Sequence, residues 1–212
     1  MAVASQSLFN MTVASDNAGG NQGLLMPKLQ YRFRVLFSNI GTTNDGLELT
    51  KQVIDCSRPQ VSFGEITLPV YNSTIYLAGR HEWQALTVNI RDDAQGSVAK
   101  VVGQQIQKQL DFVEQASAAT GQDYKFETDI EILDGGNGNY APAVLERWEL
   151  MGCFIQQANY NTLNYGTNDV VTISLTIRFD NAVQSPLSSG IGTDIGRILG
   201  GASTTGIGSG NG

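Results

Sequence analysis

The chain has 212 residues and a formal net charge of −7, with 41% hydrophobic and 16% charged residues. This length suits one domain with extensions, or at most two small domains, and the composition suffices for a core. The acidic balance disfavours tight binding to nucleic-acid phosphates, because that requires a basic surface that releases counterions. We expect no membrane span and no secretory signal, since the apolar runs are short and no basic residues precede the first of them.

Charge divides the chain into three parts. Residues 1–26 contain one charged residue, Asp16, and residues 182–212 contain only Asp194 and Arg197. The C-terminal part is also rich in glycine, which loses much chain entropy on folding and adds no side chain to a core. The sequence therefore predicts an N-terminal arm (1–26), a central β domain (27–181) and a Gly/Ser-rich extension (182–212).

Several central stretches alternate apolar and polar residues with a period of two, which is typical of strands with one buried face. They cover residues 29–37, 83–91, 123–133, 145–154 and 168–181. In the fourth stretch we expect Trp148, Leu150 and Phe154 on one side. In the last, we expect the odd-numbered residues from Val171 to Phe179 to face the core. Their even-numbered neighbours form a polar face of small hydroxylated side chains, followed by Arg178.

One helix interrupts the strands, at about residues 97–115. Ser97 is the expected N-cap, with acidic residues just before it. An i, i+4 stripe of apolar residues would pack on the sheet, and it comprises Val98, Val102, Ile106, Leu110 and Val113. Breaks rich in Gly, Asn and Pro separate the strands. The pattern predicts a mainly β fold, an antiparallel sandwich or barrel with this one flanking helix.

The sequence offers no catalytic constellation. His81 is the single histidine, so it has no second histidine for a metal pair, and we expect a structural or surface role for it. Glu127, Asp129 and Glu131 share a strand face, and we interpret that face as solvated. Glycoside hydrolysis would place its carboxylates on opposite sides of a cleft instead. We predict no enzyme, no metal and no cofactor.

The chain contains two cysteines, Cys56 and Cys153, and neither belongs to a CxxC motif. We expect two reduced, buried thiols. Their spacing leaves a disulfide open as the alternative.

Two stretches resemble the tube proteins of contractile tails. In residues 65–93, "EITLPVYNSTIYLAGRHEWQALTVNIRDD", a long hairpin leads through Ala-Gly into a Trp-bearing strand, and the helix follows. Residues 147–180, "RWELMGCFIQQANYNTLNYGTNDVVTISLTIRFD", resemble the closing strand pair of that family. The resemblance covers about residues 27–181. It departs from the family at Ile155, where a proline is common, and in the Gly-rich extension.

This resemblance implies a hexameric ring in which the subunits join into one continuous inner β-barrel, and rings that stack into the tube of a contractile phage tail. The polar face would then line the lumen. The residues implied there are Thr87, Asn89, Thr172, Ser174 and Thr176. Small neutral groups would let genomic DNA pass without holding it.

The resemblance also implies that the hairpin contacts the next ring. The residues implied there are Glu65, Val70, Tyr71, Asn72, Ile75 and Leu77. The ordinary alternative is a hairpin packed on its own domain. Further implied partners are the tail sheath, the baseplate, the tail terminator and a tape measure protein in the lumen. The implied location is the virion tail, assembled in the host cytoplasm.

Other functions remain open at this stage. The tube could belong to a phage-like injection or secretion machine. A β-sandwich binding or baseplate module would use exposed aromatic residues, for which Tyr140, Tyr160 and Tyr165 are candidates.

Overall fold

The computed structural model describes residues 28–42, 46–135, 141–185 and 191. The predicted N-terminal arm, Tyr140 and nearly all of the C-terminal extension lie outside these residues. The described elements follow one another as β1 (Phe33–Ser38), α1 (Gly46–Gln52), β2 (Val53–Cys56), β3 (Val61–Val70), β4 (Ser73–Trp83), β5 (Leu86–Arg91), α2 (Ser97–Gln109), β6 (Leu110–Asp111), β7 (Ala116–Ser117), the 3-10 helix η1 (Gly121–Asp123), β8 (Phe126–Leu133), β9 (Val144–Asn159), β10 (Thr172–Arg178) and β11 (Asn181–Ser185).

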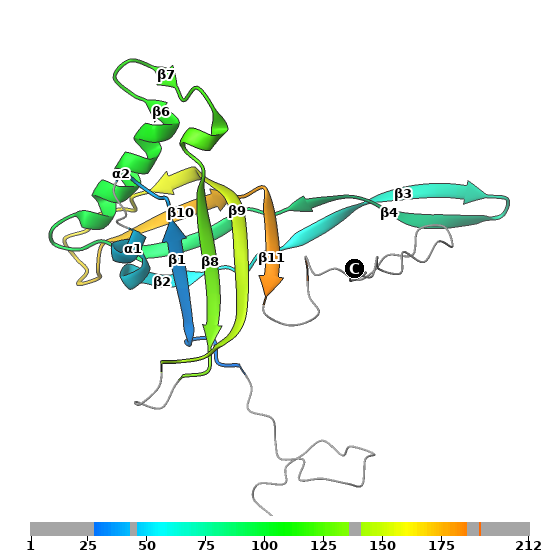
Figure 1. The fold of residues 1–212 in the computed structure, drawn as a ribbon, viewed down its shortest axis with the longest axis horizontal. Coiled ribbons are helices and arrows are strands. Elements are labelled where there is room, and N and C mark those ends of the chain that lie inside the picture. Colours follow the sequence, from blue (N-terminus) through cyan, green and yellow to red (C-terminus); the bar gives the residue numbers. More distant parts are fainter. Residues whose placement is uncertain (1–27, 43–45, 136–140, 186–190, 192–212) are drawn as a thin grey trace, which may run out of the picture.

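The fold is mainly β and antiparallel, as the sequence predicted. A seven-stranded sheet has the order β1-β8-β9-β10-β5-β2, with β11 paired to β9 beside this path. In Figure 1, β1, β8 and β9 run nearly vertically, whereas β10 and β5 run nearly horizontally, so the sheet turns sharply between its two halves. Strand β11 continues the folded domain to Ser185, beyond the boundary at residue 181 that the charge distribution indicated.

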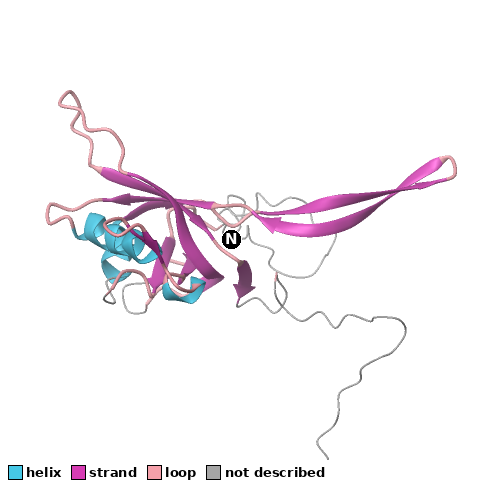
Figure 2. Ribbon diagram, turned by 90° about the horizontal axis from the view of Figure 1, so that it is seen from above, coloured by secondary structure: helices cyan, strands magenta, loops and turns pink. Residues whose placement is uncertain are grey.

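One apolar core lies between the two halves of the sheet and the helices. The inward residues of β5 and β10 are all buried, as their alternation predicted. The core also takes residues from β1, β8 and α2, including Val35, Phe126 and Val102. Figure 2 shows the helices gathered on one side of the strands. Val171, in contrast, precedes β10 and is substantially exposed, so the expectation that it faces the core is wrong.

Strand β9 spans both halves because it bends at Gly152, where φ is +68°. Residues 144–153 pair with β8, and residues 154–159 pair with β10. The bend shifts the alternation by one residue. Trp148 and Leu150 are buried as predicted, but Cys153 and Ile155 follow them into the core. The prediction that Phe154 shares the side of Trp148 is therefore wrong.

Helix α2 was predicted correctly in place and in its packed face, but its ends differ. Gly96 is the N-cap, and Ser97 is the first helical residue. The carboxylate of Asp93 accepts hydrogen bonds from the Ser97 N–H at 2.7 Å and its Oγ at 2.5 Å, so Asp93 performs the capping expected of Ser97. The helix stops at Gln109 because Leu110 adopts an extended conformation and pairs with Ser117. Val113 is exposed beyond that end.

Sequence reasoning missed Gln105, which is fully buried on α2. Its Oε1 accepts a hydrogen bond from Gly41 N at 3.0 Å, and its Nε2 donates to the Tyr124 carbonyl at 2.5 Å. A buried amide is tolerated where its partners are supplied in this way. Gln105 thus ties the helix to two connecting segments.

Two glycine-to-alanine substitutions test the bend of β9. A Cβ at Gly152 would overlap the Asp180 carboxylate, and the residue has a positive φ. We expect Gly152→Ala to lower the free energy of unfolding by about 1–3 kcal/mol. A Cβ added at Gly103 in α2 would have no atom within 4 Å apart from its own helix backbone and chain neighbours. Gly103→Ala should therefore raise the free energy by up to about 1 kcal/mol. Urea unfolding followed by circular dichroism measures both, and equal effects would contradict the role of the bend.

Candidate assembly surfaces

The predicted polar residues lie together on the outer face of β5 and β10. The two strands pair so that Ser174 lies opposite Asn89, and Thr176 lies opposite Thr87. Thr172 lies opposite Arg91 at the end of the same face. The opposite side of both strands is buried in the core. The five residues predicted to line a lumen therefore form one continuous surface.

Hydrogen bonds connect the side chains of this polar face. Ser174 Oγ donates to Asn89 Oδ1 at 2.6 Å, and Asn89 Nδ2 donates to Asp55 Oδ1 on β2 at 2.8 Å. At the other edge, Asn161 Nδ2 donates to the carbonyl and hydroxyl oxygens of Thr172, at 2.9 and 2.8 Å. Much of the hydrogen-bonding capacity of the polar face is thus used within the surface.

Both signs of charge occur at the margins of the polar face. Asp55 contributes a negative charge on β2, and Arg91 a positive charge at the end of β5. Arg178, at the end of β10, forms an ion pair at 3.0 Å with Glu82 of β4. The face therefore lacks the single-sign basic field with which proteins retain nucleic acid.

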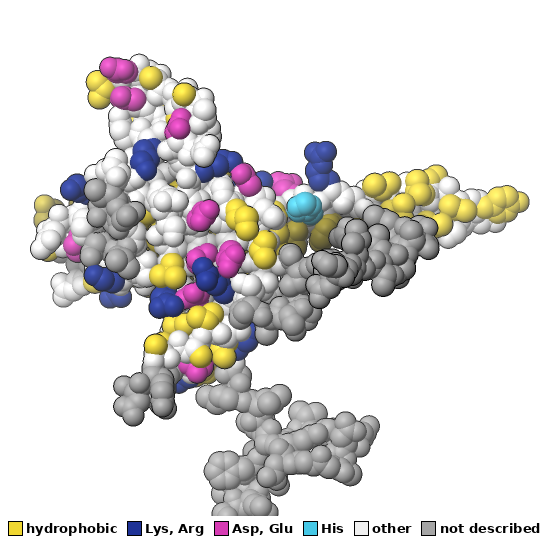
Figure 3. Space-filling model, viewed as in Figure 1, with side chains coloured by type: hydrophobic (Ala, Val, Ile, Leu, Met, Phe, Trp, Pro, Cys, Tyr) yellow, Lys and Arg dark blue, Asp and Glu magenta, His cyan; other side chains and the backbone are white. Residues whose placement is uncertain are grey.

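Strands β3 and β4 form a long hairpin that leaves the body of the domain (Figures 1 and 2). Their register places Ile66 opposite Leu77, and Leu68 opposite Ile75. With the side-chain period of two, these four residues and Val70 share one face. All five are about half exposed, between 43% and 49%. Figure 3 shows apolar side chains along the hairpin as far as its tip.

The hairpin residues implied by the family resemblance separate into three groups. Val70, Ile75 and Leu77 lie on the apolar face. Tyr71 and Asn72 form the turn, where Tyr71 has a φ of +52° and a fully exposed side chain. Glu65 pairs with Ala78 and lies on the other face. Ile66 and Leu68 were missed, although the alternation in "EITLPV" would have identified them.

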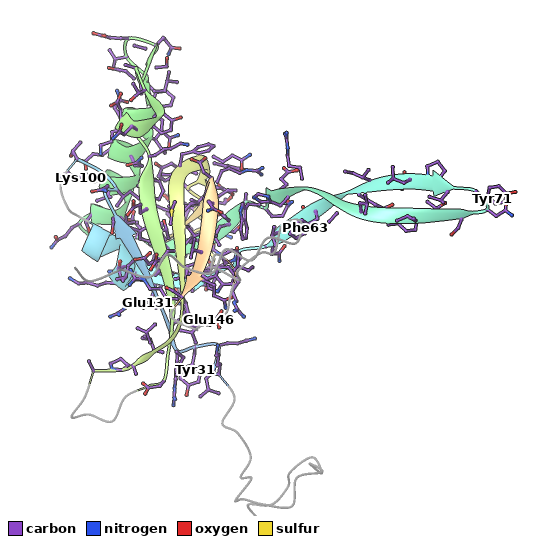
Figure 4. The ribbon with its side chains drawn as sticks, turned by 45° about the vertical axis from the view of Figure 1, so that its right-hand side comes forward. Tyr31, Phe63, Tyr71, Lys100, Glu131 and Glu146 are labelled. Atoms are coloured by element: carbon purple, nitrogen blue, oxygen red, sulfur yellow. The ribbon has the colours of Figure 1, made fainter. Side chains whose placement is uncertain are left out.

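Aromatic residues fix the root of the hairpin to the core. Trp83 is buried, and its ring lies 5.6 Å from that of Phe179. His81 contacts Trp83 edge-on at 6.4 Å and Phe63 at the same centroid distance. Figure 4 shows Phe63 near the root and Tyr71 at the far end. The expected structural or surface role of His81 agrees with this position.

A buried carboxylate joins three segments of the chain that are far apart in the sequence. Glu146 on β9 has a side chain that is 3% exposed and forms ion pairs with Lys28 and Arg58. Trp148 Nε1 donates to it at 2.7 Å, and Gln184 Nε2 of β11 donates at 3.0 Å. Burial opposes ionisation, but these hydrogen bonds and positive charges outweigh it and lower the pKa of Glu146 to about 2. The chain just before β1, the link into β3, and β11 therefore meet at one anion.

The interpretation of the acidic row as a solvated face is wrong for Glu131. Its side chain is buried, and both Arg34 Nε and Nη2 donate to Glu131 Oε2. Asp129 forms an ion pair with Arg147 at 2.6 Å, on the neighbouring strand. Figure 4 shows Glu131 and Glu146 near each other, on the paired strands β8 and β9. Glu127 is exposed, as expected.

The described residues contain no group of three or more metal-ligating side chains. Cys56 and Cys153 are free thiols, as predicted, although Cys56 is only partly buried. Burial raises the pKa of Cys56 to about 12 and that of Cys153 to about 11. A thiol with such a pKa forms little thiolate near neutral pH and reacts slowly. Across the same described segments, no helix has the length and hydropathy to cross a membrane.

The fold resembles chains in several solved assemblies. A chain of the anti-feeding prophage cap, a tube terminating cap, matches with a TM-score of 0.55, 12% identity, and coverage of 81% of this chain and 99% of that one. A chain of the six-fold symmetrised baseplate of the same prophage matches with a TM-score of 0.52 and 12% identity. The match covers 78% of this chain and 100% of that one. A chain of the sheath-tube complex of an extracellular contractile injection system matches with a TM-score of 0.51 and 13% identity. The match covers 77% of this chain and 95% of that one.

No protein-family model matches the sequence, and no curated protein does. The resemblance to contractile-tail tube proteins is confirmed at the level of the fold. Sequence identities of 12–13% show a shared fold and nothing about function. The solved neighbours are structural components of large assemblies.

A pH titration tests the carboxylate of Glu146. Because its pKa is lower in the folded chain than its ordinary 4.5, the ionised form stabilises the fold above about pH 4.5, and this contribution is lost as the pH falls towards 2. At pH 7, Glu146→Gln should lower the free energy of unfolding by about 1–3 kcal/mol. The difference from the unsubstituted protein should shrink as the pH approaches 2. The exposed Glu127→Gln is the control, and an equal loss in both variants would contradict the assignment.

Proposed function

We propose that this chain is the tube subunit of a contractile, tail-like machine. Six copies form a ring, the rings stack through the β3–β4 hairpin, and the polar face of β5 and β10 lines the lumen. The observation that carries the proposal is the hairpin, which stands clear of its own domain with an apolar face about half exposed along its length.

An isolated two-stranded hairpin is marginally stable in water. A soluble monomer also rarely displays a contiguous apolar face without a partner for it. The five residues of the apolar face therefore indicate a surface that becomes buried on assembly. The exposure of these side chains favours this assignment over a hairpin packed on its own domain.

The edges of the polar half of the sheet suit ring closure. This half consists of β2, β5, β10 and residues 154–159 of β9. Within the described part of the chain, β2 and that end of β9 each pair with a strand on one side alone. On the β9 edge, the Ile155 backbone is bonded to the Gln109 side chain, so the edge open to a second copy lies beyond Ile155. Joining the β2 edge of one copy to this part of the β9 edge of the next would produce a continuous barrel.

The fold neighbours support this assignment and indicate partners. Their descriptions include a tube terminating cap, a baseplate with six-fold symmetry, and a sheath-tube complex. By analogy, the partners are further copies of this chain, a sheath protein, a baseplate and a tail terminator. A tape measure protein would occupy the lumen during assembly. The location that follows is the tail of an extracellular particle, the virion if the machine is a phage.

Genomic DNA is the cargo that the polar face suits as part of a phage tail. The hydroxyl and amide groups of the polar face are hydrogen-bonded to one another, and the charges at its margins have both signs. The phosphates of DNA would therefore find no strong partner there. The second candidate is the tube of an injection machine that delivers protein. The sheath-tube complex of an extracellular injection system favours it. A capsid gene beside the tube gene would decide for the phage, and its absence from a complete gene cluster would decide for the injection machine.

Two double substitutions test the hairpin. Leu68→Asp with Ile75→Asp places two charges on the apolar face, where assembly would bury them. We expect this protein to remain a folded subunit that forms no tubes in negative-stain electron microscopy, because unpaired buried carboxylates are costly. Thr67→Asp with Thr74→Asp adds the same two charges to the opposite face. This control should still form tubes. Normal tubes from both variants would refute the role of the apolar face.

A single cysteine tests the lumen. In assembled tubes, Ser174→Cys should resist a bulky maleimide reagent, because the polar face lies inside. After dissociation of the tubes, the same thiol should react readily. Phe112→Cys, on an exposed segment after α2, serves as the outward control and should react in both states. Rapid labelling of Ser174→Cys in intact tubes would place the polar face outside. The native thiols react slowly for the reason given above.

A further inference from the structure

A second exposed apolar surface lies in the connection between β9 and β10. Leu163, Tyr165 and Val170 project from this loop, and Tyr165 is fully exposed. The two arms of the loop, residues 160–172, enclose a hollow of about 410 Å³. We call this surface the receiving loop.

The receiving loop and the hairpin lie at opposite ends of the polar half of the sheet. The hairpin leads into β5 at Leu86, which pairs with Ile177 near the end of β10. The receiving loop leads into β10 at Thr172, which pairs with Arg91 at the other end of β5. Figure 1 shows the same separation: the loop before β10 lies at the left, and the hairpin extends to the right. The two surfaces of one copy therefore cannot meet.

Hydrogen bonds hold the receiving loop in place before any partner binds. The loop residue Asn161 bonds to Thr172 across the base of the loop. The Val171 carbonyl accepts from Asp92 N at 2.9 Å, which attaches the loop to the end of β5. Asn164 Oδ1 accepts from Gly166 N at 2.8 Å and closes a turn. A surface fixed in this way loses less entropy on binding.

The two surfaces match in chemistry. Residues 66–77 of the hairpin contain no charged side chain, and residues 160–171 contain one, Asp169. Contact between such surfaces would desolvate almost no charge, whereas burying an unpaired charge would be costly. Tyr71 protrudes from the tip, and the hollow of the receiving loop has room for an aromatic side chain.

We propose that the receiving loop of one copy takes the hairpin tip of a second copy in the adjacent ring, with Tyr71 and Val70 against Leu163, Tyr165 and Val170. The inference rests on the proposed tube and identifies the acceptor that stacking requires. Each copy carries one donor and one acceptor at opposite ends, so the contact is head-to-tail and can repeat as an open stack. Repetition of this contact extends the tube by one ring at a time.

Disulfide trapping tests the contact with the full chain. The double variant Tyr71→Cys/Tyr165→Cys places one thiol on each surface, and both positions are fully exposed, so the fold should be unaffected. After mild oxidation at pH 8, a non-reducing gel should show a ladder of multiples. In the control Tyr71→Cys/Phe112→Cys, products beyond the dimer should be about tenfold or more weaker, since proximity raises the effective thiol concentration. Mass spectrometry should identify the peptide linked between positions 71 and 165.

Electron microscopy of the same samples separates the inference from the proposed function. Tubes without the linked peptide would overturn the receiving loop and leave the tube intact. The linked peptide without tubes would support the head-to-tail contact and overturn the proposed tube. Single subunits without the linked peptide would overturn both. If the receiving loop instead binds a different protein, tubes will form without the linked peptide, which is the first of these outcomes.

Discussion

The bend of β9 at Gly152 is the constraint on which the rest of this fold depends. One strand serves both halves of the sheet, first beside β8 and then beside β10. The positive φ of Gly152 shifts the alternation by one residue, so apolar side chains continue to face the core after the strand has turned. The polar side chains of the second half then face outward together. The five residues assigned to the lumen lie on the paired strands β5 and β10, and the bend brings the end of β9 alongside β10.

The regular parts of this structure follow from local sequence. Strands β5 and β10 were predicted residue by residue, because a period-two pattern over six or seven residues leaves one arrangement with a buried face. The apolar face of the hairpin was found in part for the same reason. Helix α2 was located by its apolar stripe, but its end was not, since Leu110 leaves the helix to pair with a strand whose two residues carry no local signal.

The features that the sequence did not reveal depend on contacts between distant residues. Glu131 appeared to belong to a solvated row, yet Arg34, almost a hundred positions away, forms an ion pair with it that allows its burial. Glu146 draws its partners from segments as far apart as Lys28 and Gln184. The shift in β9 shows the same limit, because a glycine in a strand pattern indicates a bulge without giving its direction. Alternation alone cannot predict which carboxylate forms a buried ion pair with a distant Lys or Arg side chain.

The proposed contacts also explain why rings should form before they stack. Burying the exposed half of one apolar side chain is worth roughly 1 kcal/mol, so the five residues of one hairpin face supply roughly 5 kcal/mol. Association alone costs an estimated 4–15 kcal/mol in lost translational and rotational freedom. Over most of this range, one hairpin is therefore too weak to hold one free copy. A preformed ring brings six hairpins to six receiving loops and loses that freedom once, so the proposed tube grows from an existing ring in preference to joining single subunits.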